Sequence, residues 1–100
     1  MVRHIVAWNF AEGLSAEEKH AKGAEIKKEL ENLKNLIEGI VSIEVLTEPL
    51  SSSDSEIMLD SVFKDEEALQ TYQVHPEHVR VGTNFVRPAT TNRKCIDFKF

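Results

Sequence analysis

The sequence predicts an α+β protein with the ferredoxin-like order strand, helix, strand, strand, helix, strand, a βαββαβ plait. Two observations support this prediction. Four segments alternate apolar and polar residues with the period of two that is typical of strands, at residues 2–10, 40–48, 56–63 and 94–100. Two stretches between them repeat apolar residues at the spacing of amphipathic helices. We therefore expect helices to cover one face of a four-stranded antiparallel sheet.

The first strand and the first helix are the most clearly marked elements. In residues 2–10, alternation puts one set of side chains on a common face: Val2, His4, Val6, Trp8 and Phe10. Ser15 and Glu18 have the spacing of a capping box, in which each side chain accepts a hydrogen bond from a free backbone N–H. The helix that follows should bury a stripe made of Gly23, Ile26, Leu30, Leu33 and Ile37. Gly39 should end it, because glycine tolerates a left-handed backbone.

The other three strands also have two distinct faces. Residues 40–48 separate Val41, Ile43 and Val45 from Ser42, Glu44 and Leu46, and residues 56–63 separate Ile57, Leu59 and Phe63 from Met58, Asp60 and Val62. Residues 94–100 separate Ile96, Phe98 and Phe100 from Cys95, Asp97 and Lys99. We expect the more apolar face of each strand to lie under the helices.

The second helical stretch should be broken by a proline. Asp65 can cap a short helix that continues through Tyr72. His75 precedes Pro76, and a residue before proline avoids the helical backbone region. Pro76 suits the first turn of a new helix, which should run to about Val86.

Composition limits the class of protein. One hundred residues are the size of one domain, so we expect a single domain over residues 1–100. A net charge of -5 argues against a nucleic-acid partner, because phosphates require a basic surface. No apolar segment is long enough to cross a membrane, and the N-terminus lacks the pattern of a signal peptide. The single Cys95 cannot form an internal disulfide. These features predict a cytoplasmic protein with no nucleic-acid or membrane partner.

The second face of the sheet predicts self-association. It should carry Ile5, Ala7, Ile40, Leu46, Met58 and Val62 among Arg3, Glu44, Asp60 and Asp97, with Cys95 on the same side. A monomer would expose those apolar groups as one broad patch, which is rare. Packing against a second copy of the chain is the simplest way to bury these apolar groups, so we expect a homodimer joined through the sheet faces.

The stretch TYQVHPEHVRV, residues 71–81, has two interpretations. It can be a helix–helix corner with histidines at its edge, or a functional cluster in which the bend brings Tyr72 and His78 together. A metal site is not expected. His4, His75 and His78 lack the i, i+4 spacing that places two imidazoles on one helical face, and no cysteine pair joins them.

The whole chain resembles one family. The strand and helix order, the opening HIVAWNF, the segment LQTYQVHPEHVRV and the closing CIDFKF are similar to the stress-responsive A/B barrel domain (Dabb) family. The most specific element is Tyr-x-x-His-Pro-x-His, followed by a terminal strand with the pair Asp97-Phe98. The resemblance implies a dimeric α+β barrel, in which two sheets pack face to face.

The resemblance also implies a site. A plant polyketide cyclase of the family acts without metal or organic cofactor, and by that likeness His78 would be a general base that Tyr72 assists. Substrate-binding positions would be His4, Trp8 and His75, around a small-molecule pocket between sheet and helices. The alternative is a non-catalytic, stress-associated structural or binding protein. The size of the space between Tyr72 and His78 should discriminate between them.

Overall fold

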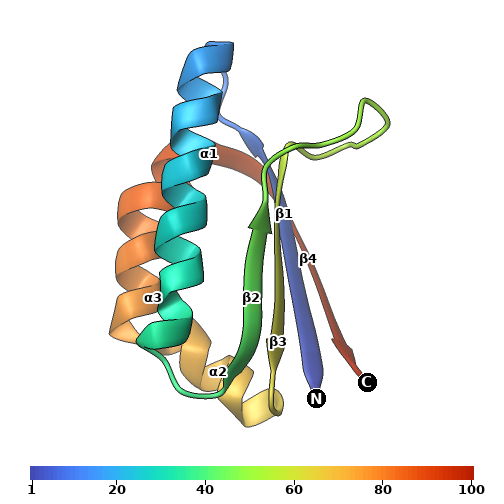
Figure 1. The fold of residues 1–100 in the computed structure, drawn as a ribbon, viewed down its shortest axis with the longest axis vertical. Helices are drawn as coiled ribbons and strands as arrows, with labels where there is room; N and C mark the ends of the chain where they lie inside the picture. Colours follow the sequence, from blue (N-terminus) through green and yellow to red (C-terminus); the bar gives the residue numbers. More distant parts are fainter.

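The computed structural model describes all 100 residues, and the strands form one four-stranded antiparallel sheet in the order β2-β3-β1-β4. The strands are β1 (Val2–Phe10), β2 (Ile40–Leu46), β3 (Ile57–Phe63) and β4 (Thr90–Lys99). The helices are α1 (Ala16–Glu31), α2 (Glu66–Val74) and α3 (Pro76–Val81). Figure 1 shows the helices on one face of the sheet only, with the other face uncovered. This arrangement confirms the ferredoxin-like α+β fold.

The first helix begins as the sequence predicts but ends earlier than predicted, at Glu31 instead of at Gly39. The Glu18 N–H donates to the Ser15 hydroxyl at 3.1 Å, and the Ser15 N–H donates to the Glu18 carboxylate at 3.0 Å, which completes the capping box. A 3-10 turn, η1 (Asn32–Asn35), follows α1. Gly39 has a φ of 91°, and a Cβ built on it would lie 2.7 Å from the Ala68 Cβ. Glycine is therefore required there by both backbone conformation and space.

The predicted break at His75-Pro76 is present. The backbone at His75 is extended, α2 ends at Val74, and Pro76 opens α3. The second segment is shorter than expected as a regular helix, because α3 ends at Val81. A five-residue π-helical turn, η2 (Gly82–Val86), and a 3-10 turn, η3 (Arg87–Ala89), then lead into β4.

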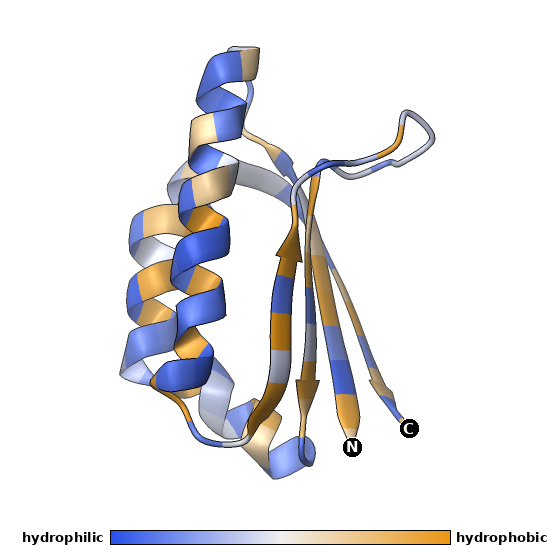
Figure 2. Ribbon diagram, in the orientation of Figure 1, coloured by the Kyte–Doolittle hydropathy of each residue, from blue (hydrophilic) through white to orange (hydrophobic).

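The core lies between the sheet and the helices. The predicted helix stripe, which runs from α1 through η1 to Ile37, and the predicted inner face of β1 are buried, and they pack with Ile57, Leu59 and Phe63 of β3. In Figure 2 the strands carry alternating hydrophobic and hydrophilic bands, whereas the loop between β2 and β3 is mostly hydrophilic. No helix is long and apolar enough to span a bilayer.

The prediction for the last strand is wrong, because its two faces are reversed. His4 pairs with Asp97 and Val6 pairs with Cys95, so these two β4 side chains share the helix-facing side. Ile96, Phe98 and Phe100 are exposed instead. The reason is that the buried His4 takes a carboxylate partner from β4, and apolar content alone could not reveal that pairing. Cys95 therefore does not lie on the face predicted for the dimer.

Ile40 was also assigned to the wrong face. A register shift between Ile40 and Ser42 interrupts the β2–β3 pairing. An extra residue at such a bulge turns the flanking side chains relative to the regular alternation. As a result, Ile40 is buried in the core and Val41 is exposed. By register Val62 belongs to the uncovered face, yet it is already buried within the chain.

Candidate functional site

A cavity of about 500 Å³ lies between the sheet and the helical layer, near the corner of α2 and α3. Its buried end is formed by residues of β1, α1, α2 and β3, and its open end by exposed residues of η3 and β4. The lining comprises His4, Val6, Trp8, Leu30, Leu59, Tyr72, His78, Gly82, Val86, Arg87, Thr90, Thr91, Asn92 and Arg93. Tyr72 and His78 both line this cavity, but their rings pack on each other, so the open space lies alongside the two rings and not between them.

Tyr72 forms part of the closed end of the cavity. Its side chain is fully buried, and its ring packs 4.8 Å from the ring of Phe63 between centroids. The hydroxyl has no hydrogen-bond partner in the protein. A buried polar group left in that state costs about 1–3 kcal/mol. Burial also raises the pKa of Tyr72 well above its ordinary value, so the hydroxyl keeps its proton and remains a donor.

His78 packs directly on Tyr72 across the corner. The ring centroids are 4.3 Å apart, at an interplanar angle of 47°. The Nδ1 of His78 lies 3.2 Å from the carbonyl oxygen of Gln73. Because a carbonyl only accepts, Nδ1 is the donor, and in the neutral ring Nε2 then carries the free lone pair. Burial lowers the pKa of His78. The positive charges nearby lower this pKa further, whereas the hydrogen bond to the Gln73 carbonyl acts in the opposite direction. The half-buried imidazole is therefore favoured in its neutral, basic form.

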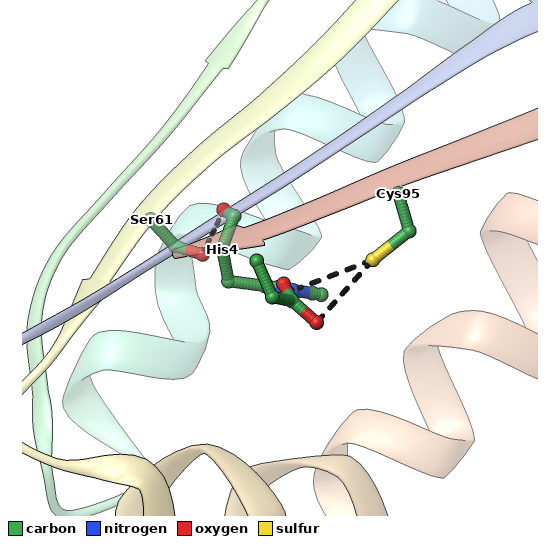
Figure 3. A network of polar contacts seen from close by, with 4 residues as sticks. His4, Ser61 and Cys95 are labelled. Atoms are coloured by element: carbon green, nitrogen blue, oxygen red, sulfur yellow. Dashed lines mark hydrogen bonds and ion pairs between the residues drawn. The ribbon is translucent and has the colours of Figure 1, made fainter. Parts of the chain in front are cut away.

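His4 enters the cavity from β1 and is held from behind. Its Nδ1 contacts the carboxylate of Asp97, and the Ser61 hydroxyl donates to its backbone carbonyl at 2.8 Å. Figure 3 shows the Cys95 side chain pointing from β4 toward the same ring. The Cys95 sulfur lies 3.9 Å from Nδ1 of His4 and 3.5 Å from a carboxylate oxygen of Asp97. The His4 ring is thereby fixed in orientation.

The same three side chains could hold a metal ion. Donor atoms of His4, Cys95 and Asp97 all lie within 4.8 Å of one another, and imidazole, thiolate and carboxylate are zinc ligands. Burial, followed by the charge of Asp97, raises the pKa of Cys95, so the thiol is protonated unless a cation displaces its proton. In the structure the three groups form a hydrogen-bonded network.

The structure brings four of the five candidate residues together. His4, Trp8, Tyr72 and His78 line the cavity, but His75 does not. The ring of His75 instead accepts a hydrogen bond from the Glu77 N–H at 3.1 Å and so caps the start of α3. Sequence reasoning missed the contributions of Arg87, Asp97 and the start of β4. The family motif includes Asp97, but its role beside His4 follows from the pairing register of β4 with β1, which places the two residues opposite each other.

Comparison with known proteins gives a consistent assignment. A family model described as Stress responsive A/B Barrel Domain matches residues 2–100. A dimeric protein of unknown function with a ferredoxin-like fold from Bacteroides fragilis is 30% identical, over 99% of this chain and 95% of that chain, with a TM-score of 0.90. A protein of Arabidopsis thaliana is 27% identical, over 99% and 94% of the two chains, with a TM-score of 0.79.

A more distant structure carries a named activity. A hydroxynitrile lyase from Passiflora edulis is 18% identical, over 97% of this chain and 90% of that chain, with a TM-score of 0.77. At that identity the likeness shows the fold alone. No curated protein matches the sequence significantly.

Proposed function

The chain belongs to the stress-responsive A/B barrel domain family, and from that premise we propose that its cavity binds a small carbonyl-bearing or aromatic molecule on which His78 acts as a general base. One observation carries the proposal. The buried Tyr72 hydroxyl has no partner in the protein, at a cavity wall that it shares with a half-buried histidine. A hydroxyl of that kind is suited to an oxygen atom of a ligand.

The chemistry that fits these groups is proton abstraction next to a carbonyl. The Nε2 lone pair of neutral His78 would take a proton from the carbon adjacent to the carbonyl. The electron pair left on that carbon would move into the carbonyl and give an enolate oxygen. Tyr72 would then donate a hydrogen bond to the oxygen as its negative charge develops, and its raised pKa keeps the proton on the hydroxyl. The step needs no metal or organic cofactor.

His4 would take a positioning role in this reaction. The Asp97 carboxylate accepts a hydrogen bond from Nδ1 of His4. In the neutral ring the free lone pair therefore lies on Nε2, where it can accept a hydrogen bond from a ligand. The His4 and Tyr72 rings are 6.3 Å apart between centroids, close enough for one small ligand to contact both. The existence of a hydroxynitrile lyase with this fold is compatible with lyase-type chemistry on such a scaffold.

The proposal also includes a homodimer joined through the uncovered sheet face. That face carries Leu46, Ile96 and Phe98, and Phe98 is 67% exposed. The reversed faces of β4 make it more apolar than the sequence indicates, and the Bacteroides fragilis relative is described as dimeric. Met58→Lys would bury a charge in this interface and should raise the dimer dissociation constant at least about tenfold, or 1.4 kcal/mol.

The dimer is tested by sedimentation at micromolar concentration. Ala21→Lys places the same charge on the exposed side of α1, so it should leave the mass unchanged. A monomeric wild-type protein, or equal dissociation in both variants, would contradict the sheet-to-sheet dimer.

The base is tested with phenylacetone in heavy water. NMR follows deuterium incorporation at the benzylic carbon, which requires abstraction of a proton next to the carbonyl. His78→Ala should slow the enzymatic exchange by about 10²–10⁴ while binding, seen as resonance shifts of cavity residues, stays nearly intact. Tyr72→Phe should slow it by about 10²–10³. His20→Ala, an exposed histidine of α1, is the control and should not change the rate.

The outcomes of this experiment distinguish a catalytic cavity from one that only binds a ligand. Binding of phenylacetone without exchange in the wild-type protein would contradict the base and leave a non-catalytic binding protein. Absence of binding at millimolar phenylacetone would contradict the small-molecule pocket.

A further inference from the structure

The charges around the cavity differ from those of the chain as a whole. The protein has 17 acidic and 12 basic residues, for a net charge of -5. The cavity lining nevertheless contains two arginines, Arg87 and Arg93, and no aspartate or glutamate. Three other hollows on the surface each include at least one carboxylate. The cavity is therefore a local positive site on an acidic protein.

The two arginines of the cavity are also free of ion pairs. The chain has four arginines, and the other two are paired: Arg3 with Asp60 at 3.2 Å, and Arg80 with Glu77 at 3.0 Å. None of the ion pairs of the protein includes Arg87 or Arg93. Both are exposed at the open end of the cavity, so their charges are available to a ligand.

Irregular backbone lies next to both of these arginines at the cavity. Four consecutive residues at the start of β4, 90–93, line it, although a regular strand would present only every second one. Asn92 has a φ of 59°, which is uncommon for a residue other than glycine, and the β1–β4 register shifts between Ala7 and Asn9. On the helical side, the π turn 82–86 leads directly into Arg87. Strained residues, bulges and π turns are concentrated at functional sites.

The inner end of the cavity has the opposite character. Val6, Leu30 and Leu59 are buried and apolar, and Trp8 adds an aromatic surface. The site therefore has an apolar interior, a polar group at Tyr72, and two guanidinium groups at its mouth. A ligand that satisfies all three regions has an apolar body and an anionic end.

We propose that the cavity selects an organic carboxylate with an apolar or aromatic body, its carboxylate held at the mouth by Arg87 and Arg93 and its body directed toward Tyr72 and His78. This inference rests on the proposed small-molecule function of the cavity and names its ligand class. Arginine suits the task because its planar fork donates two parallel hydrogen bonds to a carboxylate. The reacting carbonyl would then lie at the other end of the molecule, near the base.

The test uses two probes of the same shape, 2-naphthoate and the neutral 2-naphthamide. Binding is followed by quenching of Trp8 fluorescence, since Trp8 is the only tryptophan and lines the cavity. The wild-type protein should bind naphthoate at least about tenfold more tightly than naphthamide. Arg87→Gln and Arg93→Gln should each weaken naphthoate binding about tenfold and leave naphthamide binding unchanged.

A matched control excludes a general effect of net charge. Lys34→Gln removes one positive charge from η1, outside the cavity lining, and should leave both affinities unchanged. Equal affinity of the wild-type protein for both probes would overturn the carboxylate preference and leave the cavity proposal standing. Binding of neither probe would overturn the carboxylate preference as well, and phenylacetone binding would then show whether the cavity itself is a site.

Discussion

The two faces of the β-sheet differ in what covers their apolar side chains. On the helix side, Phe63 is fully buried against Tyr72, and the neighbouring polar groups are paired across strands or line a cavity. On the uncovered side, Phe98 and Ile96 are exposed beside the ion pair of Arg3 and Asp60. One face is thus complete within the chain except at its cavity. The other requires a second surface to cover it. Substitutions on the helix side should therefore change stability or chemistry, and substitutions on the uncovered side should change association.

The largest contrast is expected between two phenylalanines on opposite faces. Phe63→Ala should lower the free energy of unfolding by about 3–5 kcal/mol, because it opens a hole in the core. Phe98→Ala should have little effect within one chain and should weaken the dimer instead. Urea unfolding at several protein concentrations distinguishes the two losses, since only an effect on association depends on concentration. A large, concentration-independent loss for Phe98→Ala would contradict the assignment of its face.

A smaller effect of opposite sign is expected at the cavity wall. Tyr72→Phe removes the unpartnered buried hydroxyl and should raise the free energy of unfolding by about 1 kcal/mol in the ligand-free protein. Thr90→Val is the control, because the Thr90 hydroxyl donates to the Val86 carbonyl at 2.7 Å and its loss should be destabilising. Urea midpoints of the two variants measure this. Destabilisation by Tyr72→Phe would mean that the hydroxyl has a partner in the free protein.

The smallest expected effect is a pH dependence from the same wall. Burial lowers the pKa of His78 in the folded state, so below pH 6.5 the unfolded chain binds this proton more readily than the folded one. His78 should therefore reduce stability as the pH falls from 6.5 toward its folded pKa. His78→Gln should flatten the loss of stability between pH 7 and pH 5, and His20→Gln should not. Equal slopes in all three proteins would show that His78 titrates as an exposed group.

Much of the fold could be predicted from local sequence because its signals are local. The capping box of Ser15 and Glu18, the left-handed glycine at position 39 and the break before Pro76 each depend on residues within one turn. The faces of β4 could not be predicted in the same way. Ile96 and Phe98 have the composition of a core face, but the pairing of Asp97 with His4 determines the orientation.

The candidate site was predicted only in part, because some of its residues are close together in the sequence and others are not. Tyr72 and His78 lie six positions apart across a proline break, so sequence alone could bring them together. Arg93 lies on the helix-facing side of β4 with Cys95 and Asp97, so the reversed assignment of the β4 faces hid its place at the cavity. His75 shares the motif but contributes a cap, because its ring is engaged by the Glu77 N–H.

The position of β4 beside β1 has a consequence for the order of folding. His4 and Asp97 are 93 residues apart, so the contact that orients His4 is among the most distant in the chain, and such contacts form slowly. The helices and the β2–β3 pairing are closer in sequence and should form earlier. Until β4 docks, β1 would have an open edge that can pair with other chains. Recovery of ligand binding during refolding should therefore lag behind recovery of helical circular dichroism, and crowding should favour aggregation in that interval.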